Sequence, residues 1–164
     1  MAGRLRSSLT GLYTPQERER RDASPWTLVQ GVLAPFQFLV FLASVALVLR
    51  YLSTGEGYAA ATLSVIAKTI VLYVIMVTGA IWERDVFGQY LFAPAFFWED
   101  MVSMVVLTLH TLYLAALLTH ALGERGQMLL ALAAYATYVI NAAQFVLKLR
   151  AARLQASRLI EAST

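Results

Sequence analysis

Two adjacent acids, Glu99 and Asp100, stand between an aromatic segment and an apolar run that is long enough to enter a membrane. Neighbouring carboxyl groups in an apolar setting favour keeping a proton on one of them, because like charges repel and burial disfavours the charged form. A carboxyl group that stays protonated at neutral pH is what general-acid catalysis requires. Acids at a helix start also stabilise the helix dipole, which accounts for one of the two. We favour proton chemistry for the pair and keep dipole stabilisation as the alternative.

The segment before these acids is rich in aromatic rings. An aromatic belt at a membrane interface explains the tryptophans at its two ends but not the density of rings between them. Because Gly88 and Pro94 interrupt the segment, we expect residues 83–100 to form a loop that presents a flat apolar platform for a large planar ligand. Glu83, at the start of this loop, is expected to be a solvated acid. The rings are Trp82, Phe87, Tyr90, Phe92, Phe96, Phe97 and Trp98.

Two ionisable residues, Lys68 and His110, lie deep inside apolar stretches, where a charge is costly unless it is paired or functional. For Lys68 a functional role and a role as counter-ion to a carboxylate both stay open. For His110 a satisfied core histidine and a working one stay open. Near the end of the chain, Asn141 and Gln144 belong to a polar stripe that is typical of hydrogen bonds between membrane helices, with a polar pathway as the alternative. The same joining role is expected for Gln30, Ser44, Ser64 and Thr137.

The elements that must position these residues are membrane-spanning helices. Of the 164 residues, 59% are hydrophobic and 14% are charged, which is too little polar surface for a soluble domain of this length. Four apolar stretches reach the roughly 20 helical residues that a bilayer core requires. They cover residues 26–49, 58–82, 101–122 and 127–147. The sequence therefore predicts an all-α integral membrane protein with a four-helix bundle.

Three regions follow from this pattern. Residues 1–25 form a leader in which Thr14, Pro15 and Glu17 make a capping box, so a short amphipathic helix is expected there. Residues 26–149 form the transmembrane domain, and residues 150–164 form a basic tail. No cysteine is present, which excludes disulfides, thiolate metal sites and cysteine nucleophiles.

The distribution of lysine and arginine predicts the orientation, since cytoplasmic segments carry the excess of positive charge. With both termini and the middle loop inside, only Arg50 and Arg125 lie outside. The formal net charge of +3 is better explained by lipid headgroups than by nucleic acid, because the basic residues flank the membrane ends. The inside residues are Arg4, Arg6, Arg18, Arg20, Arg21, Arg84, Lys148, Arg150, Arg153 and Arg158.

Known catalytic motifs are absent: the sequence contains no HExxH, no nucleotide-binding loop, no GxSxG and no CxxCH. The residues alone therefore support a small four-helix membrane protein with an acid-and-aromatic site toward the cytoplasm. Three strings add a resemblance: "LYTPQERERRDASPWTLVQGVLAPFQFLVF", "VLYVIMVTGAIWERDVFGQYLFAPAFFWEDMVSM" and "AAYATYVINAAQFVLKLRAARL". They resemble the 3-vinyl (bacterio)chlorophyllide hydratase family of bacteriochlorophyll synthesis, over about residues 12–154.

The resemblance implies a hydro-lyase that adds water to the C3-vinyl group of a chlorophyllide or bacteriochlorophyllide and gives a 3-(1-hydroxyethyl) group. It implies no cofactor, because hydration leaves the oxidation level unchanged and magnesium arrives inside the substrate. Glu99 and Asp100 would supply the proton chemistry, and His110 would act as base or ligate the substrate magnesium. The expected substrate contacts are Phe92, Phe96, Phe97, Trp98, Lys68, Asn141 and Gln144.

The resemblance also implies a multi-pass protein of the inner or intracytoplasmic membrane of a photosynthetic bacterium. Its expected partners are the tetrapyrrole substrate and the lipid bilayer, with no nucleic acid. Other pigment-synthesis enzymes or a second copy of the chain stay open as further partners. The alternative functions are a non-catalytic pigment-binding or photosystem assembly protein and, less favoured, a small transporter.

The charge distribution gives a topological prediction. A reporter fused after Thr164 or inserted within residues 83–100 should show a cytoplasmic location, whereas one placed between Arg50 and Tyr58 should show a periplasmic location. Paired enzymatic reporters that are active on opposite sides of the membrane provide the measurement. A periplasmic signal from residues 83–100 would reverse the orientation and move the acid site to the other face.

Overall fold

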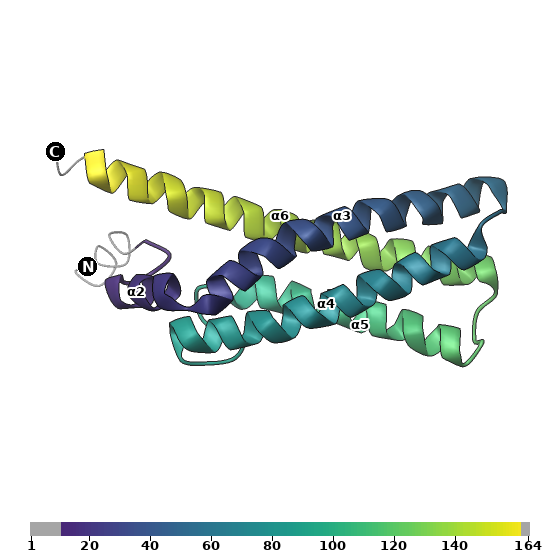
Figure 1. Ribbon diagram of the computed structural model, residues 1–164, viewed down its shortest axis with the longest axis horizontal. Coiled ribbons are helices and arrows are strands. Elements are labelled where there is room, and N and C mark those ends of the chain that lie inside the picture. The colour runs from purple at the N-terminus through teal and green to yellow at the C-terminus, as the bar shows by residue number, and fades with distance from the viewer. Residues whose placement is uncertain (1–10, 162–164) are drawn as a thin grey trace.

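The computed structural model describes residues 11–161 and contains helices but no strand within them (Figure 1). Arg4 and Arg6 of the orientation argument lie outside the described residues, as do residues 162–164. Four of the helices are long and apolar enough to cross a membrane, so the prediction of an all-α, four-helix membrane protein is confirmed. The helices are α2 (Pro15–Ala23), α3 (Pro25–Thr54), α4 (Tyr58–Phe87), α5 (Phe97–Leu118) and α6 (Glu124–Glu161).

Several helices extend beyond the apolar stretches that predicted them. Hydropathy marks the part of a helix inside the bilayer, whereas the helix itself ends only where the backbone is stopped. At α4 that stop is Gly88, whose φ of 84° places it in the left-handed region that glycine adopts freely. The prediction of a loop over residues 83–100 is therefore wrong at both ends, and the connection between α4 and α5 is only residues 88–96.

The predicted capping box of the leader is present. The Glu17 amide donates to the Thr14 hydroxyl at 3.2 Å, and the Thr14 amide donates to the Glu17 carboxylate at 2.7 Å. Helix α2 is fastened to the end of α4 by a hydrogen bond of 2.8 Å from Ser24 to Asp85. The leader helix therefore lies at the same end of the molecule as the 88–96 connection (Figure 1).

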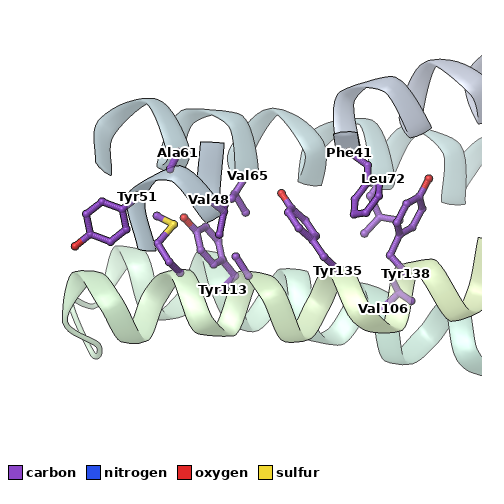
Figure 2. Packing of buried hydrophobic residues seen from close by; sticks show 12 residues of the cluster. Phe41, Val48, Tyr51, Ala61, Val65, Leu72, Val106, Tyr113, Tyr135 and Tyr138 are labelled. Carbon is purple, nitrogen blue, oxygen red and sulfur yellow. The ribbon is translucent and has the colours of Figure 1, made fainter. Parts of the chain in front are cut away.

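The four long helices form two antiparallel hairpins, α3–α4 and α5–α6, and α6 crosses α3 where the hairpins meet (Figure 1). Polar side chains join them, as predicted for Gln30, Ser44 and Ser64. The prediction is wrong for Thr137, whose hydroxyl donates to the Ala134 carbonyl of its own helix. Ser44 on α3 lies 2.7 Å from Ser64 on α4 and 2.5 Å from the hydroxyl of Tyr135 on α6. Gln30 on α3 donates to Thr78 on α4 at 2.7 Å. Aromatic rings fill much of the space between the hairpins (Figure 2).

Candidate active site

Two consecutive backbone amides of the 88–96 connection each hold a carboxyl group. The Phe92 amide donates to Asp100 at 2.8 Å, and the Ala93 amide donates to Glu83 at 2.6 Å. Phe92 has a φ of 61°, a left-handed conformation that costs a non-glycine residue roughly 1–2 kcal/mol. The strained backbone aims both amides at the acids, so the connection and the carboxyl groups determine each other's positions.

Glu83 was predicted to be a solvated loop acid, and that prediction is wrong. It lies in the last turns of α4 with only 4% of its surface exposed. Because consecutive amides hold the two acids, the carboxyl group of Glu83 lies beside that of Asp100. Two carboxylates so close in a buried setting repel each other, which favours a proton on one of them. The structure therefore pairs Asp100 with Glu83 as the candidate for proton chemistry.

Glu99 has a different partner. Its carboxylate lies 2.6 Å from the ammonium nitrogen of Lys148 on α6, and the same ammonium donates to the backbone carbonyl of Ala95. Glu99 thus belongs to an ion pair, whereas Asp100 accepts from a backbone amide, so the two adjacent acids have different partners.

The polar stripe on α6 reaches the same region. The Asn141 side-chain amide donates to the backbone carbonyl of Glu99 at 2.8 Å, and the Ser103 hydroxyl lies 3.2 Å from the Asn141 carbonyl oxygen. Asn141 therefore fastens α6 to the first turns of α5. Gln144, one turn further along, has a buried side-chain oxygen for which the structure shows no partner within residues 11–161.

The predicted aromatic platform divides into two groups. Phe96 is buried at 2% exposure in a cluster of rings and holds the connection in place. Phe92 packs against Phe97 with ring centroids 5.9 Å apart, and Phe97 packs against Trp98 at 5.5 Å. Trp98 is 69% exposed, so this second group forms the outward platform. The rings around Phe96 are Tyr13, Trp82, Phe87 and Phe145.

A surface hollow of about 390 Å³ opens beside Lys148. It lies between the residues just before α2 and the part of α6 that follows the membrane stretch, with Leu12 and Gln155 among its walls. Lys148 therefore connects the buried Glu99 to a hollow at the surface.

The structure does not bring Lys68 and His110 to the acids. Both are fully buried in the middle of the bundle, and ten residues of α5 separate His110 from Asp100, which is about 15 Å of helix rise. The Lys68 ammonium lies 3.9 Å above the Tyr138 ring and has no hydrogen-bond partner among the residues described. The alternative in which Lys68 pairs with a carboxylate of the chain is therefore wrong for the part of the chain that the structure covers.

Sequence analysis missed Glu83 and Lys148 as members of the site. Glu83 lies four residues before the end of α4, and Asp100 lies three residues after the start of α5. Antiparallel helices joined by a short connection place such positions opposite each other, and this symmetry about residues 88–96 was the available signal. Lys148 had been assigned only to the basic membrane flank.

Four helices that are long and apolar enough to cross a membrane, with two neighbouring buried carboxyl groups at one end of the bundle, define a membrane protein with a candidate acid–base site. The comparisons narrow this class. The 2-vinyl bacteriochlorophyllide hydratase (BCHF) family matches residues 13–151, and the chain belongs to this family. The chain is 66% identical over 150 residues to the 2-vinyl bacteriochlorophyllide hydratase of Rhodobacter capsulatus. The aligned region covers 92% of this chain and 87% of that protein.

A second relative agrees. The 2-vinyl bacteriochlorophyllide hydratase of Cereibacter sphaeroides is 68% identical over 146 residues, covering 87% of this chain and 89% of that protein. No solved structure matches the chain. The predicted resemblance to this hydratase family is confirmed.

The contacts of Asn141 predict a structural role. Asn141→Leu should lower the free energy of unfolding by roughly 0.6–2 kcal/mol, the value of hydrogen bonds between membrane helices, and leave turnover per folded molecule unchanged. Thr137→Val is the matched control, because the Thr137 hydroxyl bonds only the Ala134 carbonyl of its own helix. Thermal unfolding in detergent and an activity assay normalised to folded protein make the comparison. Normal stability with abolished turnover would instead place Asn141 in the reaction.

Proposed function

We propose that this hydratase adds water to the vinyl group of a bacteriochlorophyllide by acid catalysis at the Glu83–Asp100 pair. A proton passes to the terminal vinyl carbon, and the positive charge develops on the carbon attached to the macrocycle, which delocalises it. Water attacks that carbon, Glu99 takes the proton that the water loses, and return of this proton to the Glu83–Asp100 pair restores the acid. The product is a 3-(1-hydroxyethyl) group, and no oxidant, reductant or protein-bound metal is needed for the balance.

The observation that carries the proposed mechanism is that consecutive backbone amides hold two buried carboxyl groups side by side. In this arrangement Glu83 and Asp100 share one proton, because two adjacent buried carboxylates would repel each other. The apolar cluster around Phe96 excludes bulk water from this pair. A general acid of this kind typically contributes about 10²–10⁴-fold to a rate.

Glu99 is suited to orient the attacking water. It forms an ion pair with Lys148 and lies next to Asp100 in the chain, and Lys148 lines the surface hollow. An ionised carboxylate orients a water by accepting one of its hydrogens and takes up positive charge as the oxygen attacks. Glu99 thus acts as the base and the Glu83–Asp100 pair as the acid.

The pigment itself fits the outward platform of Phe92, Phe97 and Trp98. Phe97 and Trp98 are exposed and Phe92 is half-buried at the membrane end where the acids lie, and flat apolar faces suit a planar macrocycle. The charge distribution supports a cytoplasmic location for this end, and the relatives from photosynthetic bacteria support an inner or intracytoplasmic membrane. Magnesium belongs to the substrate. Other pigment-synthesis enzymes are the partners that would supply the vinyl compound and consume the alcohol.

The acid pair gives the central prediction. Asp100→Asn and Glu83→Gln each remove the transferable proton, while the amide oxygen still accepts from the backbone and the amide hydrogens still reach the remaining carboxylate. Each variant should bind vinyl bacteriochlorophyllide like the parent and hydrate it at least about a hundredfold more slowly. The measurement is the gain of one water in the pigment mass over time.

Asp85→Asn is the matched control, because Asp85 is an exposed acid on the same helix turn as Glu83. It should turn over like the parent. If both acid-pair variants also keep the parental rate and lose only up to about 1 kcal/mol of stability, the carboxyl groups serve the connection and the helix dipole alone. Intact pigment binding without any hydration by the parent would instead support a pigment carrier.

A further inference from the structure

The ammonium of Lys148 has a hydrogen-bond donor left after its two contacts in the bundle. It binds the carboxylate of Glu99 and the backbone carbonyl of Ala95, whereas a lysine ammonium carries three donors. The Lys148 side chain is 27% exposed and lines the surface hollow of about 390 Å³ beside it. A group that enters the hollow can therefore accept the third hydrogen bond.

Small residues make the room in this hollow. Gly11, Ala151 and Ala152 line it, and a Cβ built on Gly11 would meet no other atom within 4 Å. Leu12 adds an apolar wall, and Gln155 adds a side-chain amide. Such a lining suits a polar group on a short apolar stem, because the stem contacts methyl groups while the polar end contacts the ammonium.

The charge around the hollow favours an anion. The last part of α6, residues 148–160, contains four basic residues and no acid, and Glu99 balances the charge of Lys148 alone. An excess of positive charge beside a hollow attracts anions, and an ammonium with a free donor binds a carboxylate through a charge-assisted hydrogen bond. The basic residues are Lys148, Arg150, Arg153 and Arg158.

The pigment of the proposed reaction has a group of this kind. A chlorophyllide differs from a chlorophyll in that its propionic acid side chain is not esterified, so its macrocycle carries a carboxylate on a short stem. A charge is costly inside a bilayer, whereas the macrocycle is apolar. A bound pigment must therefore direct this carboxylate out of the membrane, and the hollow lies beside the part of α6 that follows the membrane stretch.

The hollow and the outward platform meet at the start of α5. Ala95 and Glu99, the two residues that Lys148 binds, lie on either side of the platform rings Phe97 and Trp98 in the chain. A macrocycle on the platform thus lies beside the cation without entering the bundle. Because the vinyl group and the propionate belong to different pyrrole rings, the pigment can present one to the acids and the other to the hollow.

We propose that the hollow beside Lys148 binds the free propionate of the bacteriochlorophyllide, with the Lys148 ammonium as the partner of its carboxylate. The identity of this ligand rests on the proposed function, but the site adds a requirement that the acid pair does not impose, since hydration of a vinyl group needs no carboxylate elsewhere in the molecule. Contact at both ends fixes the direction in which the macrocycle lies on the platform.

The test compares two substrates that differ only at this group: the vinyl bacteriochlorophyllide and its propionate methyl ester. Both are supplied to the parent protein in nanodiscs of zwitterionic lipid, in which no anionic headgroup competes for the hollow. The parent should show a KM about tenfold lower for the free acid, the effect of one charge-assisted hydrogen bond, with similar kcat for both. Lys148→Met should abolish this ratio of KM values, whatever it does to kcat through Glu99.

Ala152→Leu tests the hollow without removing a charged group. The larger side chain fills the room beside Lys148, so the KM for the free acid should rise to that of the ester while kcat stays parental. Ala156→Leu is the matched control, because Ala156 is also half-buried on α6 but does not line the hollow, and it should keep the parental values.

Equal KM values for acid and ester in the parent overturn the propionate site and leave the proposed function standing, whereas hydration of neither pigment contradicts both. A preference for the acid that survives in Lys148→Met or in Ala152→Leu also overturns the site, because the carboxylate then binds elsewhere. Should either variant fail to fold, the two pigments on the parent still decide.

Discussion

The structure depends on one constraint: carboxyl groups buried at the end of an apolar bundle must find hydrogen-bond donors. The 88–96 connection meets that constraint with its own backbone, through the amides of Phe92 and Ala93. Neither partner is stable alone, because the connection contains a strained residue and the acids would lie unpaired in a dry environment. The hydrogen bonds that hold this connection in its conformation are therefore the same ones that satisfy the buried acids.

Several elements that are distant in the sequence contact this end of the bundle. Helix α2 holds Tyr13 against Phe87, with ring centroids 5.9 Å apart, and so closes the cluster that contains Phe96. Lys148 approaches from α6 and binds both Glu99 and the Ala95 carbonyl. Residues from the leader, the middle of the chain and its last helix thus converge on a nine-residue connection. Each contributes either a donor or the exclusion of water, the two requirements of buried acids.

The helices are predictable from the sequence, since long apolar stretches, a capping box and glycine stops follow local rules. It also indicates that Asp100 belongs to a chemical site. The partner of Asp100 was not predictable from local pattern, because Glu83 comes from another helix and adjacency in sequence favoured Glu99 instead. Adjacent helical residues point about 100° apart, so Glu99 and Asp100 face different neighbours. For Lys68 the sequence predicted a carboxylate partner as one alternative, and the described part of the structure contains none.

The length of α6 has a mechanical consequence. It runs without interruption over 38 residues from the turn opposite the site to Glu161, and an unbroken helix behaves as a stiff rod. Lys148 is fixed to this rod where it passes the connection, and the rod continues beyond it (Figure 1). Any load that tilts the protruding segment shifts the ammonium relative to Glu99 and Ala95. A displacement of the far end of α6 is therefore transmitted to the contact between Lys148 and Glu99, with the crossing of α6 and α3 as the pivot.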